Sequence, residues 1–102
     1  MNAIADTAAA MLDGSISYLL GARRIMDLGF KADLDRDPDF LPFIGVYSES
    51  DALPLDPEFR KRWQPEALLR LEPAIEAKER WAREFLRPYC VRLNERFGSS
   101  SN

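Results

Sequence analysis

The stretch AIEAKERWAREFLRPYCVRLNERF, from Ala74 to Phe97, decides the class of fold. Apolar residues recur in it every three or four positions, the period at which side chains share one face of an α-helix. The stripe consists of Ile75, Ala82, Phe85, Leu86, Tyr89, Cys90, Leu93 and Phe97. The sequence therefore predicts a long amphipathic helix, kinked at Pro88 because proline removes a backbone hydrogen bond.

Charged residues fill the other positions of this helix. Glu76–Arg80, Glu79–Arg83 and Arg80–Glu84 are four residues apart, a spacing typical of ion pairs on a solvated face.

Two shorter helices are predicted just before it. Asp56-Pro57-Glu58 combines a capping acid with a proline in the first turn and opens a helix through Trp63. Gln64-Pro65-Glu66 starts another through about Leu71, and Glu72-Pro73 starts the long helix.

The first third of the chain is also predicted to be helical. Its apolar residues at helical spacing are Met11, Leu12, Ile16, Leu19, Leu20, Ile25, Met26 and Phe30. Asp13-Gly14 followed by Ser15 predicts a break, with Ser15 capping the second helix. One uninterrupted helix is the alternative.

The segment from Asp33 to Phe59 is the unusual part of the sequence. Asp37-Pro38-Asp39 predicts a helix start, although Pro42 and Gly45 interrupt the apolar run that follows. A short helix competes here with a short strand through residues 44–47. The fold predicted for residues 1–102 is a single all-α domain, an orthogonal bundle of four to five helices with this irregular acidic–aromatic segment in the middle and a flexible tail at 98–102.

Composition limits the functional classes. An apolar fraction of 46% and a charged fraction of 30% are typical of a globular domain. A lone cysteine and no long apolar run favour a cytoplasmic protein without a membrane partner. The net charge of −3 argues against nucleic acid, and it conceals a net −7 in residues 33–59 and a net +4 in residues 60–102.

Catalytic chemistry has few candidates. The absence of histidine removes the commonest general base and the commonest metal ligand. Alternating aspartates at 33, 35, 37 and 39 resemble the start of a calcium loop, but Pro38 and Ile44 occupy the positions of its glycine and closing glutamate. We therefore predict no catalytic residue, metal or cofactor, and no enzymatic activity.

Arg23 falls on the apolar stripe of the first third, so its guanidinium needs a partner. We predict a structural ion pair with Glu49 or Asp51 that fixes the middle segment to the first helical half.

The middle segment also gathers aromatic residues, of which most are expected in the core and some at a surface. The residues predicted to bind a partner are Asp37, Asp39, Phe43, Tyr47, Glu49, Asp51 and Trp63. Acids beside aromatic anchors favour a basic protein as that partner.

Several short runs resemble a group of small uncharacterised bacterial helical proteins. They are Gly21–Arg24, Asp39–Phe43, Ser48–Pro54 and Arg62–Leu68, and the resemblance covers about residues 10–97. It implies no established activity.

Two main hypotheses follow from the sequence, and a carboxylate-based enzyme or divalent-ion site at residues 33–39 and 49–51 is a third option. The first is a non-enzymatic protein-interaction module, in concrete form an immunity-type protein that neutralises a basic toxin. The alternative is a structural or regulatory protein that forms a homodimer through its C-terminal helix, using Trp81 and Phe85.

Overall fold

Helices dominate the computed structural model, which describes residues 2–55 and 57–98 without the side chains of Pro57 and Phe59. The predicted all-α class is confirmed, and the described residues form no strand. The capping role of Asp56 and the tail at 99–102 lie outside the described residues. The helices are α1 (Ala3–Asp13), α2 (Tyr18–Lys31), α3 (Leu41–Ser50), α4 (Pro57–Arg60) and α5 (Pro65–Gly98).

The break between α1 and α2 lies where the sequence predicts it. Gly14 adopts a left-handed conformation with φ of 86°, which glycine reaches without the steric cost of a Cβ. The predicted cap was wrong, because Ser17 accepts a hydrogen bond from the Leu20 amide at 3.1 Å. Ser15 belongs to the preceding turn, where its amide donates to Asp13 at 2.7 Å.

The middle segment is more regular than predicted, because α3 is an α-helix and the alternative strand at 44–47 is wrong. It begins at Leu41, later than the predicted start at Pro38. Asp37 caps the turn that leads into it. Its carboxylate accepts the Asp39 amide at 2.9 Å, and its carbonyl accepts the Phe40 amide at 2.9 Å.

α5 corrects the predicted division of the last third, because it continues through Pro73, and it also contains Pro88 as predicted. Each proline withholds one hydrogen bond from the carbonyl four residues earlier, at Leu69 and Glu84. Both residues are exposed, Leu69 to 70%, so water can reach those carbonyls.

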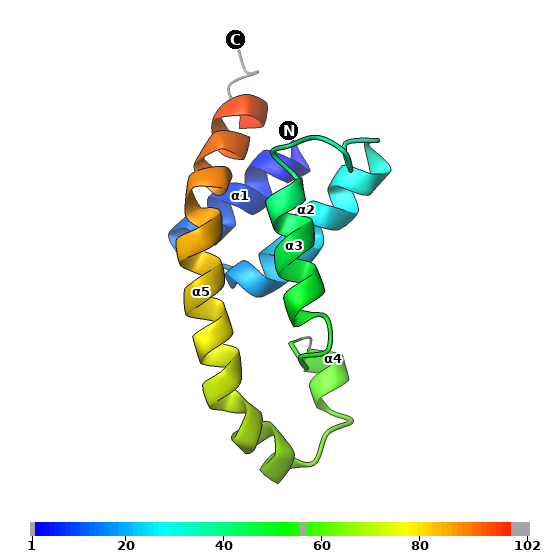
Figure 1. Ribbon diagram of the computed structural model, residues 1–102, viewed down its shortest axis with the longest axis vertical. Coiled ribbons are helices and arrows are strands. Elements are labelled where there is room, and N and C mark those ends of the chain that lie inside the picture. The colour runs from blue at the N-terminus through cyan, green and yellow to red at the C-terminus, as the bar shows by residue number, and fades with distance from the viewer. Residues whose placement is uncertain (1, 56, 99–102) are drawn as a thin grey trace.

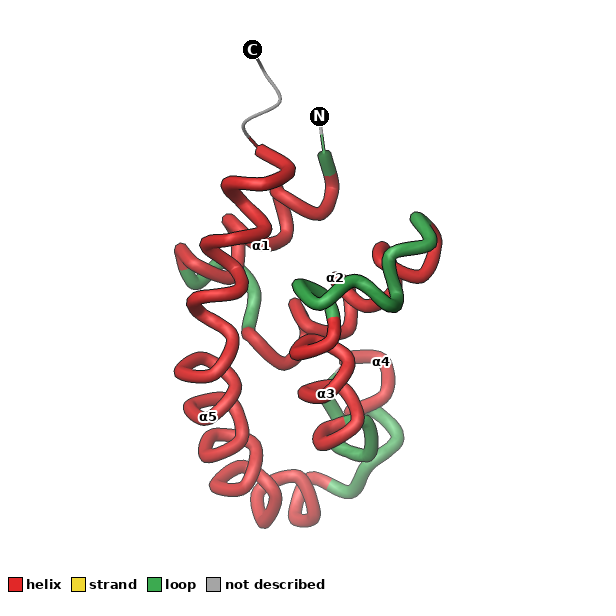
Figure 2. Tube along the Cα trace, turned by 45° about the horizontal axis from the view of Figure 1, so that its top comes forward, coloured by secondary structure: helices red, strands yellow, loops and turns green. Residues whose placement is uncertain are grey.

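The core lies where α1 packs on α5 and α2, and α2 packs on α3. Its largest fully buried side chains include Met11, Leu19, Phe43, Leu86 and Leu93. Figure 1 shows α5 along the whole length of the molecule, α3 antiparallel beside it, and α1 and α2 crossing behind them. Short loops join the helices, as Figure 2 shows, and α4 closes the end from which α5 starts.

Candidate functional site

The acids at the start of α3 bind two arginines of α5. Arg96 contacts Asp37 at 2.7 Å and Asp39 at 3.0 Å, and Arg92 contacts Asp39 at 3.1 Å. The hydrogen bond from Arg96 holds the pKa of the Asp37 carboxyl below its ordinary value. The two carboxylates are only 17% and 15% exposed because the more exposed arginines cover them, so their charge is already satisfied by these contacts.

The aromatic residues of the segment divide between core and surface. Phe43 is fully buried, as is Phe40, so the prediction that Phe43 binds a partner is wrong for this structure. Tyr47 is half-buried and lies under the Arg23 guanidinium, 5.9 Å from the ring centre. Trp63 is half-buried in the turn that precedes α5.

Arg23 does fix the middle segment to α2, but through backbone carbonyls. It donates to the Ser50 carbonyl at 2.6 Å and to the Leu53 carbonyl at 3.4 Å. The predicted ion pair is therefore wrong: Glu49 lies 3.8 Å from Lys78, and Asp51 is exposed. The Ser50 carbonyl lies at the end of α3 and carries the negative end of its helix dipole, so it satisfies a cation as a carboxylate would.

The predicted acidic–aromatic surface is thus not continuous. Asp37 and Asp39 lie at the start of α3, whereas Glu49 and Asp51 lie at its end. From Leu41, where α3 starts, to Glu49 the helix rises about 12 Å. Only the second group presents exposed carboxylates.

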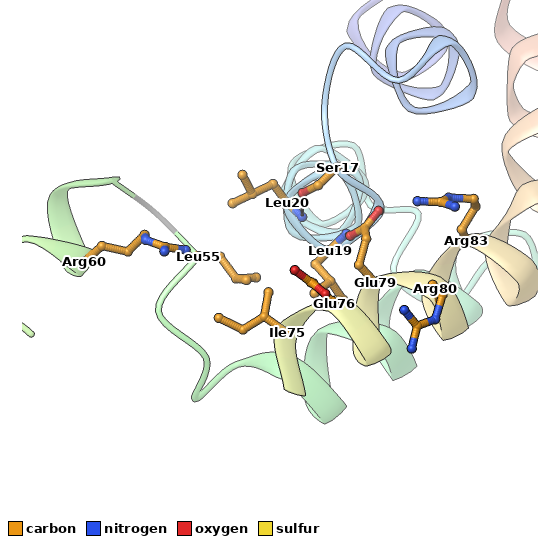
Figure 3. A pocket seen from close by; sticks show the side chains of 10 residues that line it. All are labelled: Ser17, Leu19, Leu20, Leu55, Arg60, Ile75, Glu76, Glu79, Arg80 and Arg83. Atoms are coloured by element: carbon orange, nitrogen blue, oxygen red, sulfur yellow. Dashed lines mark hydrogen bonds between the residues drawn. The ribbon is translucent and has the colours of Figure 1, made fainter. Parts of the chain in front are cut away.

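A pocket of about 450 Å³ opens between α2, α5 and the segment around Leu55 (Figure 3). Its aliphatic side chains are Leu19, Leu20, Leu55 and Ile75, and its polar side chains are Ser17, Arg60, Glu76, Glu79, Arg80 and Arg83. Arg60 is neutralised by Glu72 at 2.6 Å. In Figure 3 the Arg83 guanidinium points toward Ser17 and Glu79.

Glu79, in this pocket, has a different role from the one that its spacing to Arg83 predicts. Its carboxylate accepts the amides of Tyr18 at 2.7 Å and Leu19 at 3.1 Å, so it caps α2 from another helix. The predicted pair with Arg83 is not among the ion pairs of the described residues. The signal was present, because Glu79 precedes Ala82 and Leu86 at helical spacing and so borders the buried stripe.

Cys90 is buried on that stripe, with its sulfur 3.8 Å from the sulfur of Met11. Burial raises the pKa of its thiol to about 12. The thiol is therefore protonated near neutral pH and a poor nucleophile, as its position in the stripe predicts.

Beside its buried stripe α5 carries exposed aromatic rings, and one of them is Phe85, which its spacing had placed in that stripe. Trp81 is 39% exposed and Phe85 is 42% exposed, and their rings stack 5.8 Å apart with an interplanar angle of 3°. Lys78 lies 5.2 Å above the Trp81 ring. Other exposed apolar residues follow at three- and four-residue spacing, and we call the whole set the outer strip: Ala74, Ala77, Trp81, Phe85, Pro88 and Val91.

Comparison with known proteins adds no functional assignment: no family model matches the chain, and no curated protein or solved structure matches it. Within residues 2–55 and 57–98, no group of three or more acidic, cysteine or histidine side chains is placed to hold a metal ion. None of the helices described there has the length and apolar character needed to cross a membrane.

Proposed function

We propose that the chain is a non-enzymatic protein-interaction module, a small orthogonal bundle of four to five helices whose interaction surface is the outer strip of α5. The observation that carries this proposal is the exposed stack of Trp81 on Phe85. Both residues lie near the middle of α5, and both are exposed although they adjoin its buried stripe. Large aromatic side chains are the commonest energetic anchors of protein interfaces, since they bury much area at low entropic cost.

The strip also has the layout of an interface. Small and apolar residues continue the aromatic stack in both directions along α5, and charged residues such as Lys78, Arg80 and Glu84 border it. An apolar centre with a charged rim is typical of protein–protein contacts. The middle segment lacks this layout because Phe40 and Phe43 lie in the core.

Site-specific photo-crosslinking tests the location. A benzoyl-phenylalanine at position 81 or 85 should form a crosslinked species larger than the monomer in cells that express the protein. Phe30 offers a matched control, since it is an aromatic residue of α2 that is 50% exposed but outside the strip. Equal crosslinking at position 30, or none at 81 and 85 in a folded protein, would contradict the proposal.

A second form of the proposal is a cytoplasmic immunity-type protein that neutralises a basic toxin. Glu49 and Asp51 favour it, because both are exposed at the end of α3 beside Tyr47. Pull-down from the native host at low salt should recover a basic protein, and Glu49→Lys with Asp51→Lys should abolish the recovery. Recovery that survives this double substitution would exclude the exposed acids as its cause.

A further inference from the structure

We infer that the outer strip of α5 binds a second copy of this chain, with the two α5 helices antiparallel. This inference rests on the proposed function, because it names the partner of the same surface.

The molecule is elongated along α5, and much of this helix is left uncovered. α5 has 34 residues, about 50 Å of helix, and the whole molecule extends 50 × 24 × 22 Å. The radius of gyration is 14.2 Å, whereas a compact domain of this length has about 13 Å. The buried residues of α5 all lie in its second half, from Ala82 to Leu93. Figure 1 shows α5 along one edge of the molecule. The residues of the outer strip are exposed, so another protein can contact them.

The spacing of the strip suits another helix. Residues at 74, 77, 81, 85, 88 and 91 recur every three or four positions, the pattern with which one helix packs along another. In an antiparallel pair centred between Trp81 and Phe85, Ala77 lies opposite the partner's Pro88, and Ala74 lies opposite the partner's Val91. Small residues therefore face larger ones on both sides of the aromatic centre.

The charges beside the aromatic centre select the orientation. Arg80 and Glu84 are both exposed and lie on the same flank of the strip. A two-fold axis between antiparallel helices brings this flank against its own copy, so Arg80 lies near the partner's Glu84 and Glu84 near the partner's Arg80. A parallel two-fold pair would instead set this flank against the opposite flank of the partner helix, so the Arg80–Glu84 contacts would not form.

The same charges argue against other partners. A cation and an anion border the aromatic stack, so the strip attracts neither a purely acidic nor a purely basic surface. A surface that carries both charges in reverse order complements it, and an antiparallel second copy provides that order.

Sedimentation equilibrium of the full chain tests self-association. The wild type should form a dimer, and Trp81→Glu or Phe85→Glu should weaken dimerisation at least tenfold, about the effect of losing one central anchor. Phe30→Glu, outside the strip, should leave it unchanged. A monomeric wild type at millimolar concentration would overturn the inference. The proposed function would survive that result if photo-crosslinks at positions 81 and 85 still formed, to a different protein.

Charge reversal tests the orientation. Arg80→Glu or Glu84→Arg alone should weaken the dimer about tenfold, because each converts two attractive contacts into two repulsive ones. The double variant should restore wild-type affinity to within about threefold. A double variant as weak as the single variants would exclude this pairing.

Disulfide trapping tests the register. Ala77→Cys and Pro88→Cys proteins, mixed and oxidised, should form the 77–88 heterodimer and little of either homodimer. Cys90 can stay in place, because it is buried. Trapping of 77–77 and 88–88 homodimers instead would show a parallel pair and overturn the antiparallel one.

Discussion

The two ends of α3 are held by opposite charges in different surroundings. At its start, Asp37 and Asp39 bind Arg92 and Arg96 at the surface. At its end, the half-buried Arg23 donates to the carbonyl of Ser50, the last residue of α3, and to that of Leu53 in the loop that follows. Both arrangements suit the helix dipole, which favours anions at the start of a helix and cations at its end.

The two ends of α3 should therefore differ in how their stability depends on salt and pH. Salt screens the attraction between carboxylates and guanidiniums near the surface, and acid protonates the carboxylates. The stability of the start of α3 should therefore fall at high salt and at low pH. Carbonyls do not titrate, so the end should depend on neither. The start is also held by apolar packing, because the buried Phe40 contacts Gly29 of α2 and meets Phe97 edge-to-face at 6.0 Å.

The largest effect is expected at the end of α3. Arg23→Met should lower the free energy of unfolding by about 2 kcal/mol, because it leaves the Ser50 and Leu53 carbonyls without their charged donor. Thermal unfolding at fixed protein concentration should show a fall of about 10 °C. Arg24→Met is the matched control, since Arg24 is exposed on the same helix, and it should change the midpoint by less than about 2 °C. Equal effects of the two substitutions would show that the carbonyl contacts contribute nothing.

Local sequence patterns predicted the helix ends well where a residue's own backbone conformation determines the end. Asp13-Gly14 ended α1 as expected, because a left-handed residue favours glycine whatever packs nearby. Pro73 misled, because a proline stops a helix only where its lost hydrogen bond cannot be replaced. Nothing local shows that the Leu69 carbonyl lies on an exposed turn.

Partners across the fold were less predictable. The position of Arg23 on an apolar stripe predicted correctly that it fixes the middle segment, but the choice between carboxylate and carbonyl depends on where α3 ends. Asp37 and Asp39 looked available because the arginines that bind them lie more than fifty residues away. Glu79 was misread for the same reason, since its partners are amides of another helix.

Packing at the start of α3 should show an intermediate effect. A Cβ on Gly29 would lie 2.7 Å from the buried Phe40 ring, so Gly29→Ala should cost about 1 kcal/mol after the better helix propensity of alanine is included. Gly45→Ala is the control, because a Cβ there meets nothing within 4 Å. It should stabilise the protein by about 0.5–1 kcal/mol. Chemical denaturation gives both values, and a stabilising Gly29→Ala would show that Phe40 moves freely.

The smallest effect is expected from the surface charges at the start of α3. Asparagine at position 37 can still accept the Asp39 amide, so Asp37→Asn removes the charge and keeps the cap. We expect a loss of about 0.5–1 kcal/mol near neutral pH, in the range of partly exposed ion pairs. Because the folded-state pKa of Asp37 is lowered, its charge stabilises the protein above the unfolded-state pKa. That contribution disappears as the pH falls through the folded-state value, so the stabilities of wild type and variant should converge in acid.

The two stabilities should also converge near neutral pH in about 1 M salt, which screens the ion pairs of Asp37. Asp33→Asn is the matched control, because Asp33 is exposed with φ of 58°, which asparagine tolerates. Urea unfolding from pH 7 to pH 2 measures the difference. A loss that persists unchanged at pH 2 would show that Asp37 acts through packing, and that the two ends of α3 are held alike.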